Sequence, residues 1–129
     1  MHIQSFSILV PDYESGITFF RDSLGFDLVY DIDEGRKRWV ELRPRGGQTS
    51  VILARADTPQ QAAAIGAQGG GRVWLFLHTD DFDADYARLR ALGVPFEEAP
   101  RHAPYGTVAV FRDPFGNRWD LIQRSTADP

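Results

Sequence analysis

Two segments of the chain carry aromatic and polar side chains at alternate positions. Trp39 and Glu41 are two residues apart, and Trp74, Phe76 and His78 follow the same spacing later in the chain. Residues i and i+2 of a β-strand point to the same side of a sheet. Each segment would therefore combine flat apolar surface with a few polar groups. This combination suits binding of a small molecule, since aromatic rings supply contact area and polar groups fix orientation.

Two more residues extend this candidate site. Asp120 lies in a third alternating segment, and Tyr105 lies in a Pro-Tyr-Gly turn. His78 and Asp120 are the candidates for a general base, because imidazole and carboxylate groups accept protons. The predicted ligand-binding residues are Trp39, Glu41, Trp74, Phe76, His78, Tyr105 and Asp120.

Each candidate also has a purely structural interpretation. The aromatic side chains could fill the concave side of the sheet as a second core. His78 could serve only as a hydrogen-bonding residue where a strand passes into a helix, and Tyr105 could serve only to start a hairpin. We favour a ligand site because each repeat described below already has an aliphatic face to cover its helix.

The composition limits the class of protein and its partners. The 129 residues are 43% hydrophobic and 25% charged, which is the balance of a globular protein. A net charge of −4 opposes binding to nucleic acid. No apolar run approaches the ~20 residues of a membrane helix, and the N-terminus lacks the basic start of a signal peptide. We therefore expect a cytoplasmic protein that binds neither nucleic acid nor membrane.

The chain contains two copies of one pattern of elements. Asp12 and Asp81 are predicted N-caps of helices that end before Gly25 and Gly93, and Thr58 is the predicted cap of a short helix reaching Ile65. The predicted strands are Ser5–Val10, Phe26–Tyr30, Arg38–Arg43 and Thr49–Arg55 in the first copy, and Trp74–Thr79, Val94–Glu98, Thr107–Arg112 and Arg118–Gln123 in the second. The predicted fold class is α+β, with two βαβββ repeats forming a curled mixed sheet. We expect one domain over residues 1–129, with repeat one at 1–55, a linker at 56–72 and repeat two at 73–124.

This order of elements resembles the vicinal oxygen chelate superfamily, which includes glyoxalase I, extradiol dioxygenases and bleomycin resistance proteins. The most specific segment is Asp113–Ile122, DPFGNRWDLI, which matches the D-P-x-G-x-x-x-E/D-L pattern of that superfamily. Val10–Tyr13 and Phe19–Phe26 add support. The resemblance implies a homodimer whose curled sheets form clefts.

The resemblance also implies where a metal would be held, on three or four His or Glu ligands. The corresponding positions are Ser5, Leu53, Trp74 and Asp120. Only Asp120 retains a carboxylate, whereas sites for Zn, Ni or Fe need several converging donors. We therefore expect neither a metal nor another cofactor, although a relocated site built from Glu41, His78 and Asp120 stays open.

The sequence leaves three functional hypotheses. The first is a metal-independent small-molecule binding protein of the bleomycin-resistance type, a homodimer with an aromatic-lined cleft for an aromatic or cationic compound. The second is an enzyme, either a lyase, isomerase or dioxygenase relative with a displaced metal, or a metal-free isomerase using His78 or Asp120 as base. The third is an interaction module whose cleft is filled by its own side chains or a partner chain. The sequence does not decide whether the protein is an enzyme.

Overall fold

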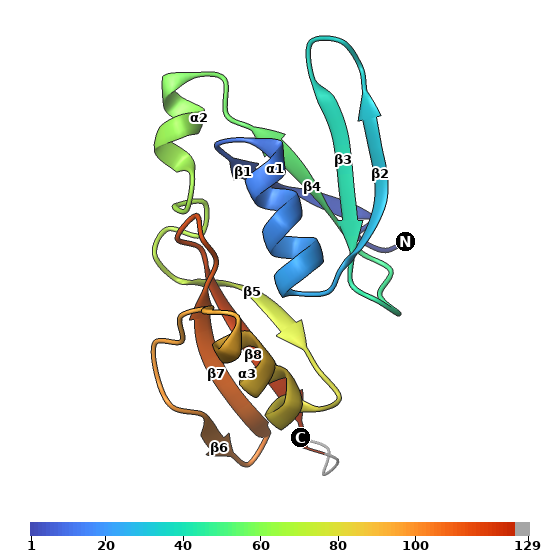
Figure 1. The fold of residues 1–129 in the computed structure, drawn as a ribbon. Coiled ribbons are helices and arrows are strands. Elements are labelled where there is room, and N and C mark those ends of the chain that lie inside the picture. Colours follow the sequence, from blue (N-terminus) through green and yellow to red (C-terminus); the bar gives the residue numbers. More distant parts are fainter. Residues whose placement is uncertain (126–129) are drawn as a thin grey trace. The chain divides into compact units, whose positions relative to one another are not determined.

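A computed structural model describes residues 1–125, so the last four residues of the predicted domain lie outside the described residues. The chain divides into two compact units, Met1–Gly66 and Ala67–Pro129. Each unit contains an open four-stranded mixed sheet, with a helix packed against one face (Figure 1). The helical segments are α1 (Tyr13–Ile17), its π-helical continuation η1 (Thr18–Ser23), α2 (Pro59–Ala64) and α3 (Phe82–Ala91). The predicted fold class is confirmed, while the grouping of both units into one domain stays a prediction.

The first unit has strand order β1-β4-β3-β2. Its strands are β1 (Ser5–Val10), β2 (Asp27–Asp33), β3 (Arg38–Arg43) and β4 (Ser50–Arg55). β1 runs parallel to β4, and the other neighbours are antiparallel. The bounds of β1 and β3 match the prediction at both ends.

The second unit repeats this topology as β5-β8-β7-β6. Its strands are β5 (Val73–His78), β6 (Arg101–Ala103), β7 (Gly106–Arg112) and β8 (Arg118–Arg124). β5 runs parallel to β8, and β7 pairs antiparallel with β8 and β6. The repeated order β-α-β-β-β is thus present in both halves of the chain.

The predicted helix caps are confirmed. The Asp12 carboxylate accepts a hydrogen bond from the Ser15 amide at 2.7 Å, and Asp81 accepts one from the Ala84 amide at 3.2 Å. The first helix differs from the expectation of one regular helix, because its second half is π-helical. There the Leu24 amide donates to the Phe19 carbonyl five residues earlier.

One predicted strand is wrong. Residues Val94–Glu98 form no strand in the structure, and only Phe96 makes an isolated bridge, to Phe111 of β7. The Pro95 carbonyl accepts a hydrogen bond from the Arg112 amide at 3.0 Å, but Pro95 has no amide hydrogen to donate in return, which limits the pairing with β7. The fourth strand of the second sheet is instead β6, a short strand that reaches β7 through the Pro104–Tyr105 turn.

The start of the Asp113–Ile122 motif forms the turn between β7 and β8. Asp113, 3% exposed, accepts hydrogen bonds from the Phe115 and Asn117 amides, the Asn117 side chain and the Trp119 indole at 2.9 to 3.1 Å. The indole stacks on Phe111 beneath α3. This segment therefore fixes the position of Asp120, the next residue of β8.

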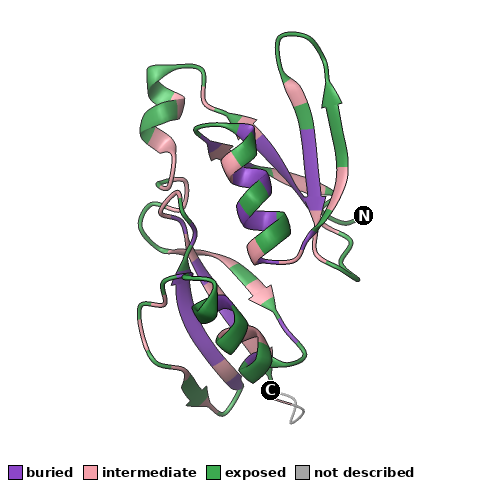
Figure 2. Ribbon diagram, in the orientation of Figure 1, coloured by how far each residue is buried: buried purple, intermediate pink, exposed green. Residues whose placement is uncertain are grey.

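Burial follows the central strands (Figure 2). Buried residues occupy much of β3, β4 and β7, whereas the tip of the β2–β3 hairpin and most of α2 are exposed. Among the described residues, no helix has the length and apolar character needed to cross a membrane.

Candidate functional site

Strand alternation separates two faces in the first sheet. Leu53 pairs with Val40 and fills the space beside Gly16 of α1, where a Cβ atom would lie 2.6 Å from Leu53 Cδ1. These residues belong to the face covered by α1. We call the opposite face of this sheet the far face. Its side chains include Ser5, Ser7, Ile32, Trp39, Glu41, Arg43, Ser50 and Ile52.

Trp39 is held on the far face by a buried carboxylate. Its indole Nε1–H donates to Glu41 Oε1 at 3.1 Å, while 40% of the Trp39 surface stays exposed. Glu41 is 3% exposed, and its Oε2 accepts from Arg43 Nη2 at 3.2 Å and Gln4 Nε2 at 3.5 Å. Arg43 Nε also donates to Ser50 Oγ at 2.9 Å. The indole plane is therefore fixed before any ligand arrives.

The Glu41 carboxylate stays ionised despite its burial. Burial alone would raise its pKa, but hydrogen bonds from Ser50 and Trp39 and the charge of Arg43 outweigh that effect. The pKa of Glu41 therefore lies below its usual value. Its charge is balanced within the far face, which leaves little attraction for a cationic ligand.

A cavity of about 290 Å³ adjoins Trp39 within the first unit. It lies where β4 ends and β3 begins, and it is bordered by the hairpin tip and α2. The lining residues are Ser7, Tyr13, Arg36, Lys37, Arg38, Trp39, Ile52, Leu53, Ala54, Arg55, Asp57 and Gln61. Its size approaches the lower end of small-molecule pockets, roughly 300 Å³.

Three predicted site residues share one face of the second sheet. Phe76 pairs with Asp120 across β5 and β8, and His78 pairs with Ile122 two residues further along. Phe76 is 68% exposed. His78 Nδ1 lies 3.9 Å from an Asp80 carboxylate oxygen, at the passage from β5 into α3. The structure thus places Phe76, His78 and Asp120 on the face opposite α3.

Trp74 and Tyr105 make contacts within the fold of the second unit. Trp74 lies at a register irregularity of β5 and packs on Gly69, where a Cβ atom would come within 2.6 Å of Trp74 Cβ. Tyr105 lies in the β6–β7 turn, and its carbonyl accepts a hydrogen bond from the Ser125 amide at 2.9 Å. The turn therefore does join a hairpin, and contact of either side chain with a ligand stays a prediction.

Asp120 has one carboxylate oxygen without a protein partner. Its Oδ1 is buried and accepts no hydrogen bond among the described residues. Burial raises the pKa of Asp120, an effect that the nearby charge of Arg101 opposes. Contact of this oxygen with a ligand stays a prediction.

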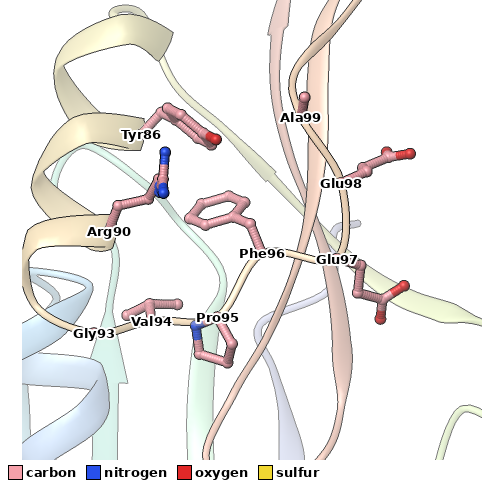
Figure 3. Close-up of a pocket in the computed structure, with 9 residues that line it drawn as sticks. All are labelled: Tyr86, Arg90, Gly93, Val94, Pro95, Phe96, Glu97, Glu98 and Ala99. Atoms are coloured by element: carbon pink, nitrogen blue, oxygen red, sulfur yellow. The ribbon is translucent and has the colours of Figure 1, made fainter.

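A larger cavity, about 520 Å³, lies in the second unit between α3 and residues 93–99 (Figure 3). The Arg90 guanidinium lies 5.6 Å from the centre of the Tyr86 ring, and the Phe96 ring packs edge-on against Tyr86 at 4.6 Å. Glu97 is paired with Arg112 and Arg118. These groups already satisfy one another, and this cavity contains none of the predicted site residues.

The positions that the resemblance implies for a metal do not fit one. Ser5 and Trp74 offer a hydroxyl and an indole, and only Asp120 offers a carboxylate. The assignment of Leu53 to a ligand position facing the cleft was wrong, because its side chain packs against α1. Within residues 1–125, no group of three or more His, Asp or Glu side chains is arranged to hold a metal ion. We therefore derive no chemical step through a metal.

Sequence reasoning missed the basic part of the first cavity. Arg36 and Lys37 come from the hairpin tip, Arg55 from the end of β4 and Tyr13 from the start of α1. The sequence signal is the basic run Arg36–Arg38, which is not among the predicted site residues. Antiparallel pairing of β3 with β4 brings that run beside Arg55.

The family model described as Glyoxalase/Bleomycin resistance protein/Dioxygenase superfamily matches residues 2–121. The chain therefore belongs to this superfamily, which confirms the resemblance inferred from the Asp113–Ile122 motif.

Relatives of this chain include both uncharacterized and ligand-binding proteins. It is 46% identical over 126 residues to an uncharacterized protein of Shewanella frigidimarina (strain NCIMB 400), covering 95% of this chain and 93% of that protein. The crystal structure of TnmS3, an antibiotic binding protein from Streptomyces sp. CB03234, is similar at 38% identity and a TM-score of 0.80, covering 97% of each chain. A glyoxalase/bleomycin resistance protein from the same Streptomyces strain is similar at 36% identity and a TM-score of 0.75, covering 95% of this chain and 100% of that one.

Proposed function

We propose that this protein binds a small aromatic molecule without a metal, using Trp39 of the far face as a stacking surface. The observation that carries this proposal is the Trp39–Glu41 hydrogen bond of 3.1 Å, which fixes a 40% exposed indole in one orientation. A rigid aromatic surface binds flat molecules with a small loss of side-chain entropy. The similarity to TnmS3, an antibiotic binding protein, supports the same class of function.

Calorimetric titration with a panel of planar aromatic compounds tests this proposal. We expect Trp39→Ala to weaken binding by about tenfold or more, because it removes the stacking surface. Trp39→Phe keeps a ring but loses the hydrogen bond to Glu41, so its loss should be smaller. Leu92→Ala is the matched control, since Leu92 is an exposed apolar residue outside the site. Unchanged affinity in Trp39→Ala for every compound that binds would refute the role of Trp39.

The second unit carries its own group of predicted ligand-binding residues. We propose that a ligand contacts Phe76, Trp74, His78, Tyr105 and Asp120 there. Phe76→Ala gives the most direct check, because its side chain is the most exposed of these rings. A ligand whose affinity is insensitive to both Phe76→Ala and Asp120→Asn would restrict the site to the first unit.

We also propose that the protein is a homodimer, as the resemblance implies, and that it is located in the cytoplasm. Light scattering coupled to size-exclusion chromatography should give twice the chain mass of 14.5 kDa. A mass of one chain across micromolar concentrations would contradict the dimer. Cell fractionation tests the location.

An enzyme that uses Asp120 as a general base is the second candidate. It is favoured by the buried Oδ1 that accepts no hydrogen bond among the described residues. Asp120→Asn should then abolish turnover of a bound compound, detected by mass spectrometry, while leaving its affinity within about threefold. Recovery of every bound compound unchanged from the wild-type protein would contradict this candidate.

A further inference from the structure

We propose that the cavity of the first unit binds the anionic group of an aromatic ligand, with the ring on Trp39 and the anion beside Arg55, Arg36 and Lys37. The inference rests on the proposed function and names the class of ligand for the same site. A carboxylate or sulfonate on a planar ring has the required chemistry.

The charge of the lining carries this inference. Four cationic side chains, Arg36, Lys37, Arg38 and Arg55, border the cavity with a single carboxylate, Asp57. This concentration of positive charge occurs in a chain whose net charge is −4. The lining of the cavity thus carries more positive than negative side chains, and an anion is the complementary ligand.

One of these cations, Arg38, already forms ion pairs within the protein. Arg38 Nη1 lies 2.6 Å from Glu14 Oε1, and its Nη2 lies 2.7 Å from Asp31 Oδ2. The other three cations form no ion pair within 4.0 Å anywhere in residues 1–125; they are Arg36, Lys37 and Arg55. Their charges are thus available to a ligand.

The position of Arg55 is fixed by an uncharged group. Its guanidinium lies 5.5 Å from the centre of the Tyr13 ring, and Arg38 lies 5.2 Å from the same ring. Tyr13 is 7% exposed and accepts a hydrogen bond from the Arg38 amide at 3.3 Å. A cation–π contact orients a guanidinium without neutralising it or occupying its N–H donors. Arg55 can therefore donate two parallel hydrogen bonds to a carboxylate or sulfonate.

Trp39 completes the site because it lines the same cavity. Trp39 and Ile52 line it from the far face, whereas Arg55 lies over Tyr13 on the side of α1. The paired register of β3 and β4 ends at Val40 and Leu53, so Trp39 and Arg55 border the cavity where the two strands separate. About 290 Å³ accommodates an anionic substituent and part of the ring that bears it. The remainder of the ring would lie over the exposed indole.

A matched pair of probes separates the contribution of the ligand's charge to affinity from that of its ring. We would measure the affinities of 2-naphthoate and 2-naphthamide by calorimetry, since both are planar and nearly equal in size. The wild-type protein should prefer naphthoate by about tenfold at low salt, which corresponds to about 1.4 kcal/mol. This preference should shrink as salt screens the exposed charges.

Two arginine variants test the location. Arg55→Gln should reduce the preference for naphthoate to about twofold or less, while the affinity for naphthamide stays within about twofold. Arg90→Gln is the matched control, because Arg90 also lies over a tyrosine ring, at 5.6 Å from Tyr86, but in the second unit. The control should keep the full preference.

The outcomes distinguish the two proposals. Equal binding of both probes that still depends on Trp39 would overturn the anion site and leave the aromatic site standing. Loss of the preference in Arg90→Gln but not in Arg55→Gln would overturn the location. If neither probe binds in a way that depends on Trp39, the aromatic site itself is contradicted.

Discussion

Replacing Glu41 by Gln tests whether the carboxylate charge organises the far face. Gln keeps an oxygen that can accept the Trp39 Nε1–H, now 3.1 Å away. In the wild-type protein, Arg43 Nη2 lies 3.2 Å from Glu41 Oε2. In the Glu41→Gln variant, the side-chain amide –NH₂ takes the place of that oxygen. The substitution therefore removes one charge-assisted hydrogen bond and places two donors opposite each other.

The expected loss follows from these contacts. A hydrogen bond to a charged group contributes about 1.5–3 kcal/mol. The Arg43 side chain is 34% exposed, so water replaces part of that interaction and reduces the effect. We expect Glu41→Gln to lower the free energy of unfolding by about 1–2 kcal/mol near pH 7.

The pH dependence gives a second, independent measurement. Because the folded-state pKa of Glu41 is below its usual value of 4.5, the folded protein binds this proton less readily than the unfolded chain. The carboxylate thus stabilises the fold above that pH, and this stability is lost as pH falls through the folded-state pKa. Urea unfolding followed by circular dichroism should show the gap in stability between wild type and Glu41→Gln narrowing as the pH falls below 4.5.

Glu14→Gln is the control, since Glu14 is a largely exposed partner of Arg38 and should change stability by less than about 0.5 kcal/mol. A Glu41→Gln protein as stable as wild type at pH 7, or a gap that does not change with pH, would refute the role assigned to the charge. All proteins would be compared at one concentration, because the dimer proposed above would make apparent stability depend on concentration.

Three further substitutions test the packing that positions the site. Gly16→Ala should lower stability by about 1–3 kcal/mol, measured as a decrease in Tm, because its new methyl group meets Leu53 Cδ1 at 2.6 Å. Asp113→Ala should cost about 2–4 kcal/mol in urea unfolding, since it leaves the buried Trp119 indole and three further donors without an acceptor. Asp81→Ala should cost about 1 kcal/mol through loss of the α3 cap, and equal stability of this variant would contradict the capping role.

Much of the fold could be predicted because its signals are local. Asp at each helix start and Gly after each helix gave the caps, and the repeated spacing of these signals gave the two units. The prediction of a strand at Val94–Glu98 was wrong, although proline is compatible with an edge strand. In this segment the pairing with β7 is limited to the Phe96–Phe111 bridge and its flanking hydrogen bonds, and Pro95 has no amide hydrogen with which to extend it.

The candidate site was predicted only in part, because strand alternation is local and register is not. Alternation placed Trp39 and Glu41 together, since two residues of one strand need no partner to define their shared face. The side on which Leu53 lies depends on how β4 is aligned with its neighbours, and a shift of one residue reverses every side chain. The basic cavity was missed for a similar reason, since Arg36 and Arg55 become neighbours only through the pairing of β3 with β4.

The charge arrangement of the first unit limits which ligand could use the far face. Glu41 is the only carboxylate among the far-face residues named above, and both of its oxygens accept hydrogen bonds from Trp39, Arg43 and Gln4. A metal or an organic cation would have to displace those donors and leave the Arg43 charge unbalanced, which is unfavourable for a carboxylate that is 3% exposed. A neutral ring over the indole displaces none of them. Three cations without an ion pair, Arg36, Lys37 and Arg55, border the adjoining cavity with one carboxylate, Asp57, so positive charge is in excess there. A planar anion is therefore the ligand that complements both the indole and the cavity, in line with the proposal above.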